Sequence, residues 1–178
     1  MKKILIIIGT NADFAYNRYL AHFIAKRYAG QVSFQVQEIK DIPLFDGNVA
    51  PDSVIALREA VETADGVIIC TPEYDRAIPS SLKSALEWLG AHAGTHVMNY
   101  KKVMVVGAAL SSVGASNAQE DLREVLMSPD LAANVLPGNE VLIGHVQDKI
   151  DKKTGDFASP EDLMALDHAF ESFMQFMK

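Results

Sequence analysis

The sequence is poor in cysteine, in basic charge and in long apolar runs. Its 178 residues include one cysteine, so no disulfide can form within the chain. Acidic residues outnumber basic ones by 23 to 16, and no cluster of lysine or arginine offsets the formal net charge of -7. This balance argues against a surface for nucleic acid or anionic membranes. No apolar run approaches the roughly 20 residues that cross a bilayer, so we expect neither a nucleic-acid nor a membrane partner.

The length and the amino terminus indicate a single cytoplasmic domain. A chain of 178 residues fits one domain, 1–178, that is large enough to bury a sizeable core. Two lysines precede an apolar run that ends at Gly9. That run is shorter than the roughly 7 to 15 apolar residues of a secretory signal, and no small-residue cleavage site follows it. We therefore expect the protein in the cytoplasm.

Short apolar runs alternate with amphipathic segments along the chain. Almost wholly apolar runs predict buried strands, and an alternating pattern predicts a more exposed strand near a sheet edge. The predicted strands span 4–8, 32–39, 66–70, 102–107 and 140–143, and the predicted helices span 16–28, 52–64, 79–91, a segment that opens within 108–116 and ends near 127, and 159–177. Five strands and five helices predict a doubly wound α/β fold with a five-stranded parallel sheet, order 2-1-3-4-5, and helices on both faces. A ligand is expected beside strands 1 and 3, at their carboxyl ends.

The most informative segment runs from Cys70 to Trp88. A buried strand stops at Thr71-Pro72, and a helix begins near Pro79. The loop between them leaves the carboxyl edge of the sheet, where open α/β sheets bind ligands. The two prolines fix φ at both ends of the loop, so its shape is expected to be preset. Cys70 itself is expected to be a small buried hydrophobe rather than a reactive thiol.

This segment resembles a signature of the NAD(P)H-dependent FMN reductases, a flavodoxin-like family that includes chromate, quinone and azo-dye reductases. The signature reads Thr-Pro-Glu-Tyr-Asn-x-x-x-Pro-x-x-Leu-Lys-Asn-Ala-Leu-Asp-Trp. Asp75 and Ser84 each stand where the family has asparagine. The positions that keep the pattern are Thr71, Pro72, Glu73, Tyr74, Pro79, Leu82, Lys83, Ala85, Leu86 and Trp88.

The resemblance implies a flavodoxin-like fold and an oxidoreductase. Such an enzyme would bind FMN, accept electrons from NAD(P)H and pass them to a small acceptor such as a quinone, an azo compound, free flavin or a metal oxyanion. The family also implies a homodimer or homotetramer. The helix at 79–91, with Trp88, is a candidate for that subunit contact, and the alternative is that Trp88 belongs to the core.

The same resemblance implies which residues surround the flavin ring. They are Pro72, Glu73, Tyr74, Asp75 and Arg76. Arg76 is expected to form an ion pair with Glu73 or Asp75. The alternative is that it attracts the phosphate of a nicotinamide nucleotide or an anionic acceptor.

The loop after the first strand has some of the groups that a phosphate site needs. Gly9 to Arg18 contains hydroxyl and amide side chains and leads into a helix N-terminus, whose free N–H groups attract anions. It is neither a Walker loop nor a dinucleotide fingerprint, so a mononucleotide phosphate is the better candidate. The loop also resembles the family's Gly-Ser-x-Arg-x-x-Ser-x-Asn segment. The cofactor-binding residues expected here are Thr10, Asn11, Tyr16, Asn17 and Arg18.

The loop departs from the family pattern at three positions. The family's arginine and second serine fall on Ala12 and Ala15, and Asp13 brings a negative charge toward a doubly charged phosphate. We expect Asp13 to point away, since a like-charge contact costs on the order of 1 kcal/mol at a few ångströms. Either Arg18 compensates for the missing arginine or FMN binds more weakly. Taken alone, the hydroxyl and amide side chains of this loop would equally suit a turn and a helix cap.

The loop after the fourth strand aligns with the family's Gly-Ala-Ser-Pro-Gly-Gly-x-Gly-Gly, at the far side of the flavin. Gly107, Ala108 and Gly114 match this segment. Ser111 and Ser112 replace glycines, which narrows the backbone freedom and adds hydroxyl donors. Ser111 and Gly114 are therefore expected at the cofactor. A helix entry capped by serine would explain the segment equally well.

The sequence predicts no catalytic side chain and no metal site. His92 and His96 have the spacing of a helical zinc pair, but Gly94 lies between them and makes that pair improbable. No Gly-x-Ser-x-Gly elbow is present. The chemistry would then come from the cofactor. Two alternatives stay open, a flavodoxin-type electron carrier without NAD(P)H activity and a flavin-free binding module.

Overall fold

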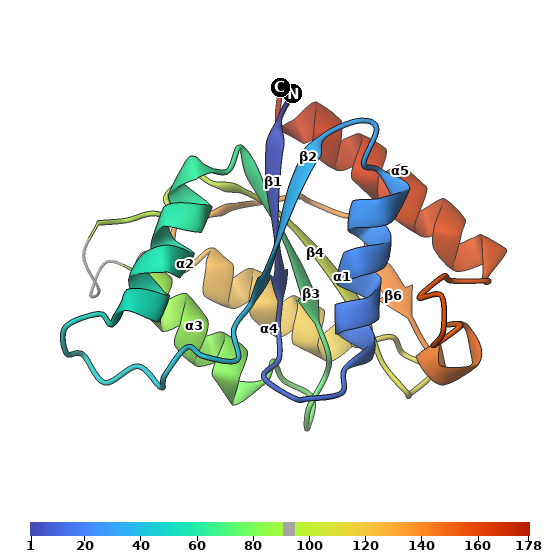
Figure 1. The fold of residues 1–178 in the computed structure, drawn as a ribbon, viewed down its shortest axis with the longest axis horizontal. Helices are drawn as coiled ribbons and strands as arrows, with labels where there is room; N and C mark the ends of the chain where they lie inside the picture. The colour runs from blue at the N-terminus through green and yellow to red at the C-terminus, as the bar shows by residue number, and fades with distance from the viewer. Residues whose placement is uncertain (91–94) are drawn as a thin grey trace.

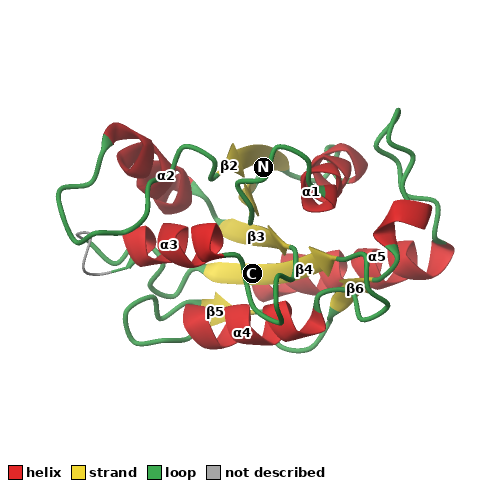
Figure 2. Ribbon diagram, turned by 90° about the horizontal axis from the view of Figure 1, so that it is seen from below, coloured by secondary structure: helices red, strands yellow, loops and turns green. Residues whose placement is uncertain are grey.

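The computed structural model describes residues 1–90 and 95–178, and its parallel sheet lies between two layers of helices (Figures 1 and 2). The strands are β1 (Lys3–Ile8), β2 (Ser33–Glu38), β3 (Gly66–Thr71), β4 (Lys102–Ala108), β5 (Asn134–Val135) and β6 (Val141–Ile143). They pair in the order β2-β1-β3-β4-β5, with β6 also on β4, and every pair is parallel. The predicted flavodoxin-like order is therefore confirmed.

The fifth position of the sheet is split between two short strands, whereas the sequence predicts one strand at 140–143. β5 pairs with the beginning of β4, and β6 pairs with its end. Pro137 between them has no N–H to donate to a ladder, and Gly138 and Asn139 have left-handed φ values of 63° and 52°. The chain therefore leaves the sheet and returns to it, and the described residues form six strands rather than five.

Two groups of helices cover the two faces of the sheet. The helices are α1 (Tyr16–Arg27), α2 (Asp52–Thr63), α3 (Ser80–Leu89), α4 (Ser116–Leu126) and α5 (Pro160–Phe176). In β1, Ile4, Ile6 and Ile8 pack with the layer of α1 and α5. Leu5 and Ile7 alternate with them and pack with the layer of α2, α3 and α4. This alternation is the period-two geometry of a strand that is buried on both faces.

Trp88 lies in the core of the chain. It is 1% exposed, and its indole Nε1 donates a hydrogen bond of 2.9 Å to the carbonyl of Pro43. The ring of Phe45 meets it edge to face at 4.8 Å between centroids. The alternative that Trp88 belongs to the core is therefore confirmed, and its side chain is not available for a subunit contact. The predicted last residue of that helix, Ala91, lies outside the described residues, as do His92 and Gly94.

The two termini lie side by side at the amino edge of the sheet (Figure 1). Nζ of Lys2 donates a hydrogen bond of 2.6 Å to the carbonyl of Met177. Within residues 1–90 and 95–178, no helix has the length and apolar character needed to cross a membrane. The same residues contain no group of three or more His, Cys, Asp and Glu side chains that could hold a metal ion. The carboxyl edge, at the other end of the strands, carries the loops that follow β1, β3 and β4.

Candidate active site

A cleft of about 470 Å³ opens at the carboxyl edge of the sheet. Its walls come from the three loops that follow β1, β3 and β4, which are the loops that the sequence predicts to converge. The lining residues are Phe14, Ala15, Tyr16, Asn17, Pro72, Glu73, Tyr74, Asp75, Ala108, Ala109, Leu110 and Ser111. Seven of the twelve predicted cofactor residues therefore line one cavity.

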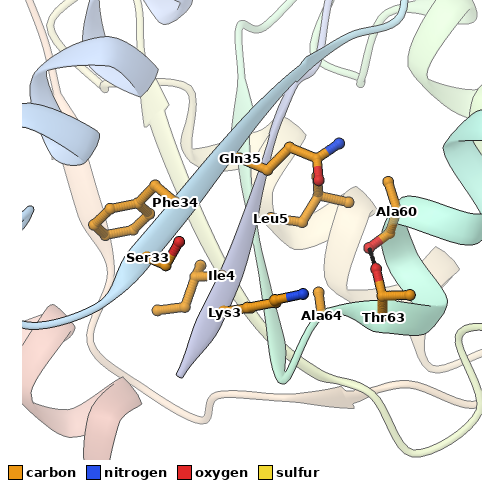
Figure 3. A pocket seen from close by; sticks show the side chains of 9 residues that line it. All are labelled: Lys3, Ile4, Leu5, Ser33, Phe34, Gln35, Ala60, Thr63 and Ala64. Carbon is orange, nitrogen blue, oxygen red and sulfur yellow. Dashed lines mark hydrogen bonds between the residues drawn. The ribbon is translucent and has the colours of Figure 1, made fainter. Parts of the chain in front are cut away.

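A second hollow, of about 230 Å³, lies at the opposite edge of the sheet between β1, β2 and α2 (Figure 3). It is lined by the strand starts at Lys3 and Ser33 and by the end of α2 at Thr63. The hydroxyl of Thr63 is used within its own helix, where it donates to the carbonyl of Glu59 at 2.9 Å. This hollow has half the volume of the cleft and lies away from the strand ends where α/β sheets bind ligands. We therefore assign no function to it.

The loop after β3 is held in one shape by a tight turn. The N–H groups of Tyr74 and Ala77 each donate to the other residue's carbonyl at 3.0 Å, and Asp75 and Arg76 between them have φ values of 49° and 67°. Two consecutive left-handed residues are typical of a type I′ turn. The flanking prolines predict a preset loop shape, and the turn with its two reciprocal hydrogen bonds also stabilises that shape.

Glu73 fixes this loop to α4. Its carboxylate accepts hydrogen bonds of 3.1 Å from Nδ2 of Asn117 and from the backbone N–H of Ala118, in the first turn of α4. A carboxylate at a helix N-terminus satisfies unpaired N–H groups and interacts favourably with the helix dipole. Glu73 therefore caps α4 from a neighbouring loop.

The prediction that Arg76 pairs with Glu73 or Asp75 is wrong for the residues that the structure describes. No ion pair forms there between Arg76 and either Glu73 or Asp75, and Arg76 does not line the cleft. The reason is that the carboxylate of Glu73 is bound to α4 and that the turn places Asp75 toward the cleft. A role for Arg76 in attracting an anionic substrate stays a prediction.

The loop after β1 is joined to the loop after β3. Thr10 is fully buried, and its Oγ1 lies 3.2 Å from the hydroxyl of Tyr74 and accepts a 3.2 Å hydrogen bond from the N–H of Ala12. The N–H of Gly9 donates to the carbonyl of Cys70 at 2.8 Å. Thr10 is thus a link between two loops rather than a lining residue of the cleft.

Asn17 joins the start of α1 to the end of β4. It is 1% exposed, and its Nδ2 donates to the carbonyl of Ala108 at 2.8 Å. Its Oδ1 accepts from the N–H of Ala108 at 3.0 Å. Both ends of the amide are therefore used to bridge residues that lie 91 positions apart in the sequence. Together with the Thr10–Tyr74 contact, this bridge makes the three loops one connected framework.

Charged residues around the loop after β1 are paired with each other. Nε and Nη2 of Arg18 bind the carboxylate of Glu38 at 2.5 and 2.9 Å, and its other N–H groups donate to the carbonyls of Ala12 and Asp13. Asp13 binds Lys40, a hydrogen bond that lowers the pKa of its carboxyl, and it does not line the cleft. Asp13 therefore points away, as expected. The predicted contact between Arg18 and a phosphate stays a prediction.

The loop after β4 contributes Ser111 to the cleft but not Gly114. The carbonyl of Ser111 accepts from the N–H of His145 at 3.0 Å, and the serine is exposed at the cleft. Gly114 has φ of 60° and packs against the backbone of Leu142. Asn11 is exposed and also lies outside the lining residues. Gly114 is thus a packing position, while the assignment of Asn11 stays a prediction.

Sequence reasoning missed five residues that line the cleft. They flank the predicted positions in the same loops and are Phe14, Ala15, Ala108, Ala109 and Leu110. Phe14 is 54% exposed and Leu110 is 61% exposed. A large apolar residue in a loop that follows a strand at the carboxyl edge is the signal that could have found both.

Cys70 behaves as the sequence predicts. It is fully buried in β3, and burial raises the pKa of its thiol well above the ordinary value. A buried neutral thiol is a poor nucleophile. The site therefore contains no thiolate chemistry at Cys70.

Comparison with known proteins identifies the family. The model of the NADPH-dependent FMN reductase family matches residues 2–148. The chain is 53% identical to NADH-dependent flavin reductase subunit 2 of Lactobacillus johnsonii, over 99% of this chain and 97% of that protein. It is 39% identical to the CrdA subunit of the NADH:(hydroxy)cinnamate reductase of Vibrio ruber, over 97% and 85% of the two chains. It is 30% identical to a quinone reductase of Escherichia coli, over 99% and 97%.

A solved structure shares the fold. The flavoenzyme NAD(P)H:(acceptor) oxidoreductase of Paracoccus denitrificans superimposes with a TM-score of 0.83 at 22% identity, covering 99% of this chain and 97% of that one. This likeness supports the architecture, and the family match and the relatives establish the kind of protein. The chain therefore belongs to the family of NADPH-dependent FMN reductases, and it is an FMN-dependent oxidoreductase that uses NAD(P)H.

Proposed function

We propose that FMN binds in the cleft at the carboxyl edge. NAD(P)H reduces the bound FMN, and a small acceptor then takes the electrons from it. The residues that would hold the ring come from the loops after β3 and β4, at Pro72–Asp75 and Ala109–Ser111. The N-terminus of α1, at Tyr16 and Asn17, would hold the phosphate end. The observation that carries this proposal is the framework of three cross-linked loops around one cleft.

The residues present fit the flavin ring. A volume of about 470 Å³ is within the range of small-molecule sites, roughly 300 to 1,000 Å³. Aromatic and aliphatic side chains of Phe14, Tyr16, Tyr74 and Leu110 line the cleft and suit a flat, largely apolar ring. Two acidic residues, Glu73 and Asp75, also line the cleft, and the carboxylate of Glu73 is bound to the N-terminus of α4. The cleft thus offers apolar and aromatic surface for the ring, with polar side chains at Asp75 and Ser111.

Bound FMN supplies the redox chemistry, since its ring accepts a hydride and releases electrons. The chain contributes position rather than proton transfer. The turn at Tyr74–Ala77 and the bridge from Asn17 to Ala108 hold opposite walls of the cleft in place. At the entrance of the cleft, the side chains of Tyr74 and Leu110 are 47% and 61% exposed. Solvent therefore reaches this apolar part of the cleft. An open mouth of this kind suits a donor and an acceptor that enter one after the other.

The acceptor class that we propose is a flat, uncharged or weakly charged aromatic compound. The large exposed side chains at the entrance of the cleft are apolar or aromatic, with Phe14 and Leu110 more than half exposed, and Asp75 and Ser111 are smaller polar residues beside them. Relatives of this chain are named for reducing flavin, quinones and azo compounds, which share this chemistry. Quinones, azo compounds and free flavin are therefore preferred over a metal oxyanion. The family match argues against the carrier without NAD(P)H activity and against the flavin-free module.

We extend the proposal to a cytoplasmic homodimer or homotetramer. Two relatives are named as subunits, which makes assembly a question to settle in solution. Analytical ultracentrifugation of the purified protein would measure the mass of the assembly in solution. A mass of one chain, 19.4 kDa, at all concentrations would contradict the proposed homo-oligomer.

Filling the cleft should prevent flavin binding without unfolding the protein. Ser111 is exposed and lines the cleft, so Ser111→Phe places a ring where the flavin would lie. We expect an affinity for FMN that is at least about tenfold weaker. A bulky side chain that overlaps with the bound ring reduces the binding free energy by more than about 1.4 kcal/mol. Quenching of flavin fluorescence would measure the dissociation constant.

The neighbouring serine provides the matched control. Ser112 is also exposed but does not line the cleft, so Ser112→Phe should bind FMN like the unmodified chain. Circular dichroism of both variants checks that the fold is kept. If Ser111→Phe bound FMN as tightly as Ser112→Phe and the unmodified chain, the flavin would bind somewhere other than this cleft.

A further inference from the structure

The side-chain cations of the loop after β1 and its neighbour are already bound to carboxylates. The guanidinium of Arg18 forms an ion pair with Glu38, and Nζ of Lys40 binds Asp13. Ala12 stands at the position where the family resemblance places arginine. A dianionic phosphate at the N-terminus of α1 would therefore meet backbone N–H groups without a free cation from its own loop.

A cation from a distant part of the sequence reaches the same end of the cleft. Nζ of Lys152 lies 5.5 Å from the ring centre of Phe14 and 5.5 Å from that of Tyr16. Both rings line the cleft, and they pack edge to face at 5.0 Å between centroids. Lys152 is exposed and forms no ion pair within residues 1–90 and 95–178. Its contacts with the two rings are weak compared with a charge-assisted bond to phosphate.

The backbone that carries Lys152 is anchored. Ile150 and Phe157 form an antiparallel bridge on either side of it, and both are buried. The ring of Phe157 packs against Phe23 of α1 at 5.2 Å between centroids. The anchored segment lies beyond residues 2–148, which the family model matches. Lys152 is therefore presented beside α1 by a part of the chain outside the family-matched region.

Resting on the proposed function, we infer that Lys152 binds the phosphate of FMN and replaces the arginine that the loop lacks. The ammonium group contributes a charge-assisted hydrogen bond across the open side of the Phe14–Tyr16 pair. Its effect is selective, because riboflavin has the same ring system as FMN and no phosphate. Lys152 is thus a specificity residue that favours FMN over riboflavin.

The test compares two flavins and two adjacent lysines. Dissociation constants of FMN and riboflavin are measured by fluorescence quenching for the unmodified chain, for Lys152→Ala and for Lys153→Ala. Lys153 is exposed as well and has no ring contact among the described residues, so it controls for the loss of one positive charge. We expect Lys152→Ala to weaken FMN binding about tenfold, as for loss of a bond to a charged group, with riboflavin unchanged. Lys153→Ala should leave both flavins unchanged.

Each other result overturns the inference. Equal weakening of FMN and riboflavin by Lys152→Ala would mean that the lysine only packs against the rings. An unchanged affinity for FMN, with a raised KM for NADPH but not for NADH, would place Lys152 at the 2′-phosphate of the donor. If the unmodified chain binds both flavins and Lys152→Ala changes neither, the inference alone fails. If the unmodified chain binds neither flavin, the proposed function fails with it.

Discussion

Replacing Asn17 by alanine should destabilise the protein by about 2 to 4 kcal/mol, even without flavin, because a buried donor and a buried acceptor lose their partner. The two bonds that Asn17 makes to Ala108 are 2.8 and 3.0 Å long and are the direct link between α1 and β4 at the site. Alanine offers neither group. For a chain of this size the loss corresponds to a melting temperature lower by roughly 5 to 15 °C.

Thermal and urea unfolding of the flavin-free protein would measure this effect. Asn11→Ala serves as the control, because Asn11 is exposed and its side chain makes no hydrogen bond among those the structure describes. We expect that control to stay within about 0.5 kcal/mol of the unmodified chain. If Asn17→Ala lowered FMN affinity while leaving the stability of the flavin-free protein unchanged, Asn17 would be a ligand contact and the bridge would be unimportant.

Replacing Gly114 by alanine should cost about 2 to 4 kcal/mol, through overpacking and a left-handed backbone together. A Cβ atom at this position would lie 2.4 Å from the carbonyl carbon of Leu142 and 2.7 Å from the nitrogen of Ile143. These are backbone atoms of β6, so they cannot move aside as a flexible side chain would. The substitution should therefore push the loop after β4 away from β6.

Gly138 separates the two causes of this loss. Its φ of 63° is close to that of Gly114, but a Cβ atom there would have no heavy atom within 4 Å. Gly138→Ala therefore measures the cost of the left-handed backbone alone, about 1 kcal/mol. The difference between the two variants in urea unfolding is the cost of the steric overlap. Equal losses would contradict the close packing of Gly114 against β6.

Local patterns were sufficient to predict the elements that place the site. The apolar runs at β1, β3 and β4 are buried on both faces, and a strand of that kind has few alternatives. Their carboxyl ends must then meet at one edge, which brings the three loops together. The signature from Thr71 to Trp88 added the chemistry, and four of its five predicted ring residues, Pro72 to Asp75, line the cleft. The role of each in flavin binding is still a prediction.

The sequence could not show the contacts that depend on distant partners. The bridge from Asn17 to Ala108 spans 91 positions, and the cap that Glu73 provides to Ala118 spans 45. Neither residue type nor spacing reveals such pairs, since asparagine and glutamate suit turns and solvent equally well. The split between β5 and β6 has the same origin, because it depends on which part of β4 each segment meets.

The pairing of Arg18 also lay beyond sequence reasoning. Its partner, Glu38, ends the neighbouring strand β2, and the two become adjacent only once β2 pairs with β1. That ion pair changes the interpretation of the loop after β1, since the guanidinium is bound on the β2 side. It is also the reason to look for a phosphate partner elsewhere in the chain.

The central claim is that FMN bound in this cleft accepts a hydride from NAD(P)H. Anaerobic absorbance spectroscopy of the FMN-loaded protein tests it most directly, with NADH and NADPH added in separate titrations and a quinone added afterwards. We expect the visible flavin absorbance to be lost upon addition of at least one donor and to return when the quinone is added. Flavin that stays bound and oxidised in the presence of excess NADH and excess NADPH would show that the chain does not transfer a hydride to FMN in this cleft.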